Sequence, residues 1–384
     1  MMKQKLLVLF ALLMSIVSLA EASNKKGRKV CQQNPCALKD VVKKHYPKNL
    51  YFGMATQQRL IGKLSVEITD REFDYVTPAN DFKQSYIHPE PEKWQWTRPD
   101  NFLAHAKEQG QVLRVHGPIS PQCSHWVRAD NRTPEELSKM LDEFMTALCM
   151  RINNVPAVKW MDVVNETICK NRIQYAKGKF YNAGDWFGPR EGDDKWENPW
   201  TVLGFETYKG DVYPLYIKRA FEIANKYAPN VKLIINQDSQ MDAVEWEKMK
   251  KLVGYLRAQG LRVYGIGWQA HINTGLEKDK KKMDYLDHFV SWCHQNKLEF
   301  HITEMNVWIN EGDTEDMQAA TFKGVLDVVL PHVAKGVVGV CFWNVRDEDT
   351  DKELKRGAIW RNDGSARPAY DAIKQSLLQN AIRK

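Results

Sequence analysis

Residues 158–166 read VKWMDVVNE, a mostly apolar run that ends in Glu166 beside Asn165. A second run of the same kind, EFHITEMN, occupies residues 299–306 and carries Glu304 near its end. Short apolar runs of this length, rich in β-branched residues, are typical of buried strands. Two such strands that each deliver a glutamate raise the question of whether the two carboxylates meet in the folded chain.

Strand-like runs alternate with longer amphipathic segments along the chain from about residue 50. The predicted strands are residues 51–56, 75–80, 112–117, 158–166, 231–237, 261–269, 299–306 and 336–344, and the clearest helices are 133–152, 213–228 and 242–260. This alternation predicts an α/β fold, a (β/α)8 TIM barrel in a single domain. A doubly wound open sheet is the alternative, but residues 52–58, FGMATQQ, lack the glycine-rich phosphate turn that usually follows its first strand.

Polar or aromatic residues end most of the predicted strands. All parallel strands of a barrel bring their carboxyl ends to one rim, where such enzymes place their chemistry. If residues 158–166 and 299–306 are the fourth and seventh strands, Glu166 and Glu304 face each other across that rim. The other candidate residues at strand ends are Asn80, His116, Asn236, Gln269 and Trp343.

A pair of carboxylates at one site is what glycoside hydrolysis requires. One carboxyl group must be protonated to give a proton to the departing oxygen, and the other must be ionised to attack the sugar or to activate water. From their positions, we expect Asn165 to donate to a sugar hydroxyl and His271 to hydrogen-bond Glu304. The alternative for each glutamate taken alone is an ion pair with a lysine at a strand end.

The aromatic content favours a carbohydrate ligand. The chain has 13 Trp and 14 Tyr, and residues 180–200 read FYNAGDWFGPREGDDKWENPW. Flat rings suit the apolar faces of sugars, and the indole N–H adds a hydrogen-bond donor. Many of these rings must be ordinary core, but we expect Trp343 to line the site.

The amino terminus predicts export. Residues 1–22 contain an early lysine, an apolar run and small residues at Ala20 and Ala22, which is the pattern of a secretory signal peptide. Residues 23–48 form a basic arm, which we expect to be a solvated tail, and residues 49–384 the catalytic domain. The net charge of +7 lies mostly on this arm, so the body is near neutral and lacks the basic face of a nucleic-acid binder. We therefore expect a secreted or periplasmic protein without a membrane span, and a monomer.

Seven cysteines are present, and Cys31 with Cys36 is the nearest pair that an oxidising compartment could join. No cysteines have the spacing of a zinc site. The sequence thus predicts neither a metal ion nor an organic cofactor.

Several segments together resemble glycoside hydrolase family 10, the family of retaining endo-β-1,4-xylanases built on a (β/α)8 barrel. In chain order they are WMDVVNE, GIGWQAH, HITEMNV, VCFWNVRD and RPAYDAI, and the resemblance spans roughly residues 50–377. It implies that Glu166 is the acid/base and Glu304 the nucleophile. It implies that Asn80, Lys83, His116, Asn165, Asn236, Gln269, His271 and Trp343 bind the substrate.

The chain departs from the family pattern beside this site. Ala79 stands where the family has a glutamate that holds the next sugar, and Gln84 replaces a tryptophan. The segment GPISPQCSHW after His116 lacks the usual tryptophan and histidine, and Asn306 replaces an aspartate. The family's Ser-Trp-Arg stretch is not clear near residues 350–362, where Trp360 is the candidate substitute.

The resemblance implies a retaining β-glycoside hydrolase that cleaves xylan or a related β-linked polysaccharide by double displacement. Two carboxyl groups about 5–5.5 Å apart are expected for that outcome. An exo-acting or oligosaccharide-specific β-glycosidase on the same barrel is the main alternative. A non-catalytic glycan-binding protein is the second, and an extracellular adhesin that uses the basic arm is the third.

Overall fold

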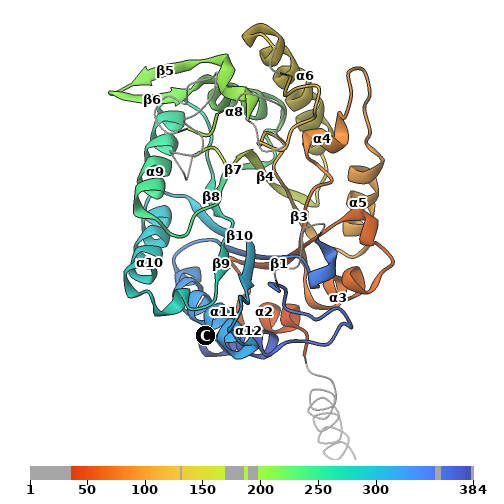
Figure 1. Ribbon diagram of the computed structural model, residues 1–384, viewed down its shortest axis with the longest axis vertical. Coiled ribbons are helices and arrows are strands. Elements are labelled where there is room, and N and C mark those ends of the chain that lie inside the picture. The colour runs from red at the N-terminus through yellow and green to blue at the C-terminus, as the bar shows by residue number, and fades with distance from the viewer. Residues whose placement is uncertain (1–35, 130–131, 169–185, 189–197, 351–355, 382–384) are drawn as a thin grey trace, which may run out of the picture.

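The computed structural model describes residues 36–129, 132–168, 186–188, 198–350 and 356–381. Eight parallel strands close into a barrel in the order β1, β2, β3, β4, β7, β8, β10 and β11, and β11 pairs back with β1. Helices surround the barrel, as Figure 1 shows in a view down the strands. The predicted (β/α)8 TIM barrel is therefore confirmed.

The strands are β1 Leu50–Thr56, β2 Tyr75–Pro78, β3 Val112–Val115, β4 Val158–Asn165, β5 Phe205–Tyr208, β6 Asp211–Pro214, β7 Lys232–Gln237, β8 Gly265–Trp268, β9 His271–Asn273, β10 Glu299–Trp308 and β11 Val338–Trp343. The α-helices are α2 Leu38–His45, α3 Leu64–Glu72, α4 Gln84–Ile87, α5 Thr97–Glu108, α6 Pro134–Ile152, α8 Leu215–Tyr227, α9 Ala243–Ala258, α10 Lys280–Gln295, α11 Glu315–Val329 and α12 Pro368–Gln379.

Each predicted strand overlaps one strand of the barrel, and β1 and β10 extend one and two residues beyond the predicted ranges. The widest difference is at residues 261–269, where only Gly265–Trp268 form β8. Helix α6 begins where expected, because the side chain of Thr133 accepts a hydrogen bond from the Glu136 amide and the Glu136 carboxylate accepts one from the Thr133 amide. Among the strands, the antiparallel hairpin β5–β6 was not predicted, nor was the short strand β9, which extends the sheet beside the end of β10.

The end of the predicted basic arm belongs to the packed body. Residues Leu38–His45 form α2, in which Leu38 and Val41 are buried, and the following Tyr46 is buried as well. Leu38 and Val41 lie three residues apart and so share one face of the helix, whereas Lys43 and Lys44 are exposed. The earlier part of the arm and the predicted signal peptide lie outside the described residues.

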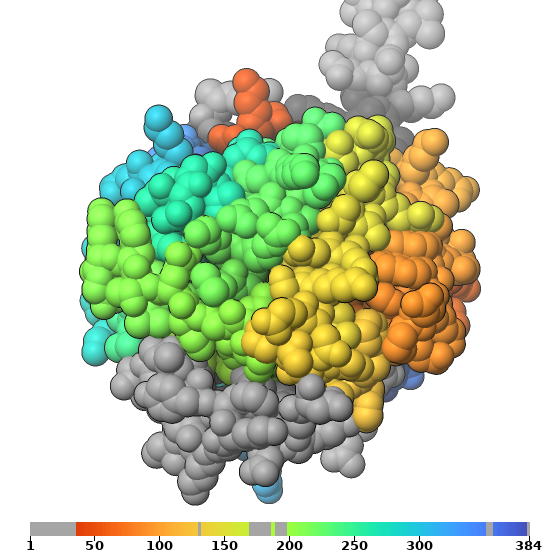
Figure 2. Space-filling view, turned by 90° about the horizontal axis from the view of Figure 1, so that it is seen from above, coloured from red at the N-terminus to blue at the C-terminus, as the bar shows by residue number. Residues whose placement is uncertain are grey.

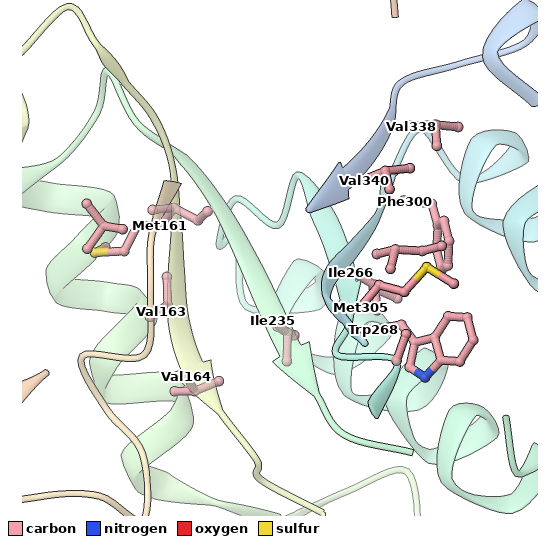
Figure 3. Close-up of a cluster of buried hydrophobic side chains, with 14 of the residues drawn as sticks. Met161, Val163, Val164, Ile235, Ile266, Trp268, Phe300, Met305, Val338 and Val340 are labelled. Atoms are coloured by element: carbon pink, nitrogen blue, oxygen red, sulfur yellow. The ribbon is translucent and has the colours of Figure 1, made fainter. Parts of the chain in front are cut away.

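The largest hydrophobic layer lies between the barrel strands and the helices. Figure 3 shows it where β4, β7, β8, β10 and β11 send Met161, Val163, Ile235, Ile266, Phe300 and Val340 outward. Alternate residues on the same strands point into the barrel, where a small cluster forms around Trp160, Tyr75 and Cys341. Helix α6, helix α8 and the β5–β6 hairpin cover one flank of the molecule (Figure 2).

Glycines make room for the large side chains inside the barrel. A Cβ atom on Gly339 would lie 2.1 Å from Nδ1 of His301, and one on Gly267 would lie 2.5 Å from Oδ1 of Asn236. Both distances are far below van der Waals contact, so neither position has space for a side chain unless its neighbour moves. Gly267 matters most for function, because it sets the position of Asn236.

Among the described residues, no helix has the length and apolar character needed to cross a membrane. Cys149, Cys293 and Cys341 are buried free thiols. The predicted pairing of Cys31 with Cys36 lies outside the described residues.

Candidate active site

The two glutamates occupy irregular positions at the carboxyl ends of their strands. The pairing of β10 with β11 shifts between Ile302 and Met305, so a bulge coincides with Glu304. Glu166 follows β4 directly and has a backbone φ of 55°. Bulges commonly redirect side chains next to active sites, and a left-handed conformation costs a residue other than glycine about 1–2 kcal/mol.

The main chain around Glu166 is held by β7. The Glu166 amide donates to the carbonyl of Asn236 at 3.1 Å. The Gln237 side-chain oxygen accepts from the amides of Thr167 and Ile168 at 3.0 and 3.1 Å. The strained turn therefore has fixed hydrogen-bond partners, and the Glu166 side chain is only partly buried at the rim.

A chain of side-chain amides joins the two carboxylates. Asn236 donates through Nδ2 to Glu304 Oε1 at 2.7 Å and to Asn165 Oδ1 at 2.8 Å. Gln269 donates through Nε2 to the same Asn165 oxygen at 3.1 Å and to Glu166 Oε1 at 2.9 Å. Four strands, β4, β7, β8 and β10, thus bring Glu166, Glu304 and the three predicted amide residues into one connected group.

Asn165 was expected only as a donor to a sugar hydroxyl, but it also joins the other two amides. Its oxygen accepts from both Asn236 and Gln269, which turns its amide N–H groups away from those partners. Those N–H groups have no hydrogen-bond acceptor among the described residues, so they are available to a ligand. The predicted donation to a sugar hydroxyl therefore remains a prediction, with the required donors in place.

Glu304 is 3% exposed, and its environment favours the ionised form. Nδ1 of His116 lies 3.5 Å from Oε1, and Nε2 of His271 lies 3.3 Å from Oε2. Burial alone would raise the pKa of Glu304, but His116, His271 and Arg114 together outweigh burial and hold that pKa far below its usual range. The expected contact between His271 and Glu304 is thus present in the structure.

Aromatic rings close the site around these imidazoles. Trp343, at the end of β11, presents its ring edge-on to His116 at 5.3 Å and to His271 at 6.2 Å between centroids. Trp308, which the sequence analysis did not single out, lies parallel to the His271 ring at 6.0 Å. Trp343 therefore lies at the site, as predicted, and the extension of β10 contributes a second indole.

A buried ion pair beneath the site also escaped the sequence analysis. Arg114 contacts the Asp162 carboxylate, and it donates to the Thr303 carbonyl at 2.8 Å and to the Tyr75 hydroxyl at 3.0 Å. Nδ1 of His116 lies 2.8 Å from Oδ2 of Asp162. These contacts fix His116 and the backbone beside Glu304. The signal was a charged residue inside each of two mostly apolar strands, Arg114 in β3 and Asp162 in β4, since buried charges are normally paired.

Asn80 and Lys83 lie in the turn after β2. Lys83 is 6% exposed, and its ammonium contacts the Gln122 side-chain oxygen. A Cβ on Gly117 would lie 3.5 Å from the Lys83 side chain and 3.8 Å from that of Asn165, so Lys83 adjoins the amide group. Asn80 is half-buried, and its carbonyl accepts from the Lys83 amide at 3.0 Å.

The positions that depart from the family pattern have structural partners. Gln84 is buried, and its side chain accepts from the Ser124 amide at 2.5 Å, which ties the loop after β2 to the loop after β3. Ala79 is buried too. Trp360 packs edge-on against Phe73 and against Tyr370, so it is a core side chain. Asn306 Oδ1 lies 3.0 Å from Nδ1 of His271.

Most of the predicted aromatic loop at 180–200 lies outside the described residues. The described tryptophans in it, Trp186 and Trp200, are 1% and 0% exposed. Both therefore belong to the scaffold in this structure.

Comparison with known proteins agrees with this geometry. A family model described as glycosyl hydrolase family 10 matches residues 37–376. The endo-1,4-beta-xylanase A of Humicola insolens is 27% identical over 324 residues, which cover 81% of this chain and 76% of that protein. The corresponding enzyme of Caldicellulosiruptor saccharolyticus is 26% identical over 328 residues, which cover 81% of this chain and 86% of that protein.

Solved structures show the same fold. Xylanase 10B of Thermotoga petrophila, in complex with xylobiose, superposes with a TM-score of 0.73 at 22% identity, and the match covers 91% of this chain and 99% of that one. Native xylanase 10B of Thermotoga maritima gives a TM-score of 0.72 at 23% identity over 90% and 99% of the two chains.

Proposed function

This chain belongs to glycosyl hydrolase family 10, and we propose that it hydrolyses xylan or a closely related β-linked polysaccharide with retention of anomeric configuration. It is a glycoside hydrolase of the endo-1,4-β-xylanase type. The observation that carries the proposal is the continuous group of amides between one buried carboxylate and one rim carboxylate. Retaining hydrolysis requires two carboxyl groups, one that attacks the anomeric carbon and one that gives and takes the proton.

The first step of the proposed mechanism forms a glycosyl-enzyme. Ionised Glu304 attacks the anomeric carbon, and Glu166 gives its proton to the departing glycosidic oxygen. The low pKa of Glu304 supports its role as nucleophile, because a protonated carboxyl group could not attack. Asn236 donates to Glu304 Oε1, and the second carboxylate oxygen lies 3.3 Å from Nε2 of His271.

The second step returns the enzyme to its starting state. Glu166, now a carboxylate, takes a proton from water, and the water oxygen attacks the anomeric carbon and releases Glu304. Gln269, 2.9 Å from Glu166 Oε1, supports the carboxylate that forms at this stage. Two inversions at one carbon give net retention.

The substrate class rests on the family and on the rings around the site. The curated relatives above are named xylanases, and the indole rings of Trp343 and Trp308 lie beside His271 at the site. We also propose that the chain is exported through its amino-terminal segment and acts as a monomer.

A direct test is to incubate the purified protein with linear xylan, glucuronoarabinoxylan and mixed-linkage xylan, and to follow product sizes over time. Glu304→Gln should abolish product formation on every substrate that the wild type cleaves. Glu311→Gln, which changes an exposed glutamate on the loop after β10, is the matched control and should retain full activity. No product from any xylan with the wild type would refute xylan as the substrate class.

One observation favours a second candidate, an exo-acting enzyme. Gln84 and Ala79 stand where the family binds the next sugar, and both are buried, so neither presents a polar group to a ligand there. A mixture of oligomers at early times would support endo cleavage. A single small product from the start would support exo cleavage.

A further inference from the structure

The loop after β3 lies along the turn after β2, on one side of the site. Near its start, Ile119 bridges to Val164 at the end of β4, and the Ile119 carbonyl accepts from the Asn165 amide at 2.9 Å. Further along, the Ser124 amide donates to Gln84 Oε1 at 2.5 Å. The loop therefore extends from the amide group between the two glutamates to the turn where the family holds the next sugar.

Gln122, in the middle of this loop, faces Lys83 on the turn after β2. Its Oε1 contacts the Lys83 ammonium. The orientation of the Gln122 amide is set by this contact, because an ammonium group can only donate and must therefore face the oxygen. The main chain is held as well, since the Gln122 backbone amide donates to the hydroxyl of the buried Ser120 at 3.2 Å.

The side-chain nitrogen of Gln122 is thus directed away from Lys83. Its two N–H groups have no hydrogen-bond acceptor among the described residues, and Gln122 is partly exposed, which leaves them open to a ligand. Lys83 connects this amide to the catalytic group, because a Cβ on Gly117 would lie 3.5 Å from Lys83 Cε and 4.0 Å from Asn165 Cγ. The side-chain donors of Asn165 and Gln122 therefore lie on the same side of the site.

We propose that Gln122 holds the sugar next to the one at the cleavage point, by donating a hydrogen bond from Nε2 to an oxygen of that sugar. The positions that the family uses for this purpose do not serve here, because Ala79 has no polar side chain and Gln84 Oε1 is bound to Ser124. Lys83 acts as the positioning residue of the Gln122 amide. The inference rests on the proposed hydrolysis of a β-linked xylan.

The exchange reverses the direction of the hydrogen bond to the substrate. The family's glutamate at the position of Ala79 can only accept, so it needs a sugar hydroxyl that donates. The Gln122 amide donates, and a donor binds a sugar oxygen whether or not that oxygen carries a hydrogen. The substrate class that this chemistry selects is a xylan chain whose second sugar presents an acceptor oxygen, including an oxygen that carries a branch.

The first test compares kcat/KM on a chromogenic β-xylobioside with kcat/KM on the matching β-xyloside, which lacks the second sugar. The ratio of the two values isolates the second sugar, because a loss of folded protein or of catalytic function lowers both. Gln122→Ala should lower this ratio by about 2- to 10-fold, the range of one neutral hydrogen bond. Gln109→Ala removes the same side chain from an exposed position after α5 and should leave the ratio unchanged.

The second test addresses the direction of the hydrogen bond. Three xylobiosides carry fluorine in place of one hydroxyl of the second xylose, at C2, C3 or C4, and fluorine can accept a hydrogen bond weakly but cannot donate one. Gln122→Glu retains an oxygen for Lys83 and exchanges the donor for an acceptor, so on the unmodified xylobioside it should stay within about 3-fold of the wild type. At one of the fluorinated positions, Gln122→Glu should fall behind the wild type by about 10-fold more, because its carboxylate then has no donor.

Two results would overturn the inference. One is an unchanged ratio of xylobioside to xyloside in Gln122→Ala, and the other is a Gln122→Glu protein that treats all three fluorinated substrates as the wild type does. Failure of the proposed function looks different, because the wild type would then cleave neither the xyloside nor the xylobioside, and this inference would fail with it.

Discussion

Replacing Asn236 by aspartate tests the connected amide group at its contact with the proposed nucleophile, Glu304. Asn236 is 0% exposed and donates to Glu304 Oε1 at 2.7 Å. An introduced carboxylate there cannot donate, and two charges 2.7 Å apart would repel by about 6 kcal/mol at an effective dielectric constant of 20. The introduced carboxylate and Glu304 would avoid this repulsion by keeping one proton between them.

Close carboxylate pairs elsewhere have apparent pKa values about 3 units apart. The cations around Glu304 keep it ionised, so the shared proton stays on the introduced carboxyl group and still donates to Glu304. When the pair loses this proton at higher pH, kcat/KM in Asn236→Asp should fall by about 10- to 100-fold, because the donor to the nucleophile is lost and a repelling charge appears. The assay is kcat/KM on a chromogenic xylobioside between pH 3 and 9, with Asn236→Ala as the control. The alanine variant removes the donor without adding a titrating group, so it should lose about 10- to 100-fold in kcat/KM without this additional fall at high pH.

A pH profile of kcat/KM in Asn236→Asp with the same shape as that of Asn236→Ala would refute the reasoning. It would mean that residue 236 does not touch the nucleophile in solution.

Three further predictions follow from the same contacts. His116→Asn removes an imidazole that lowers the pKa of Glu304, so the acid limb of the pH profile should move to higher pH. Gly267→Ala places a Cβ 2.5 Å from the Asn236 oxygen and should destabilise the fold by about 1–3 kcal/mol in denaturant titrations while lowering kcat. Glu299→Gln should leave kcat unchanged but remove a pH-dependent part of the stability, measured as the free energy of unfolding between pH 2 and 7.

The sign of the Glu299 effect follows from its environment at the amino-terminal end of the barrel. Burial would raise its pKa, but His301 and Lys232 outweigh burial and lower it from 4.5 to about 2. Its contribution of about 3 kcal/mol is therefore complete above pH 4.5 and is lost as the pH falls toward 2. A Glu299→Gln protein with the wild-type pH dependence would contradict this assignment.

Gly254→Ala is the matched control for Gly267→Ala. Gly254 lies in α9, where an added Cβ would meet nothing within 4 Å, so alanine should stabilise the helix by about 0.5–1 kcal/mol. If Gly267→Ala behaved like this control, the close approach of β8 to Asn236 would be contradicted. For His116→Asn, an unmoved acid limb would show that His116 does not act on Glu304.

The barrel was predictable because each of its strands is a short, mostly apolar run that can be recognised in the sequence. The run at 336–344 has no polar residue before Asn344, and the run at 231–237 has only Lys232 before Asn236. The helices between such runs begin and end at capping residues. The β5–β6 hairpin was missed because Phe205–Pro214 mixes charged and aromatic residues and its strands are mostly half-exposed. Helix α2 was missed because its lysines suggested a solvated tail.

The site was predictable only in part. Residues at strand ends could be grouped, since the fold brings all such ends to one rim. Which amide bonds which carboxylate could not be predicted, because it depends on the bulge at Glu304 and on the space that Gly267 leaves for Asn236. The contact of Arg114 with the Thr303 carbonyl joins residues 189 positions apart, a distance over which sequence patterns carry no signal.

The most direct test of the account is to trap the glycosyl-enzyme with a 2-deoxy-2-fluoro-xylobioside and to map the labelled peptide by mass spectrometry. We expect one label per chain, on Glu304, and we expect a Glu166→Ala protein still to become labelled when the leaving group needs no acid. A label on Glu166, or none in a protein that hydrolyses xylan, would contradict the assignment of Glu304 as the nucleophile of a retaining enzyme.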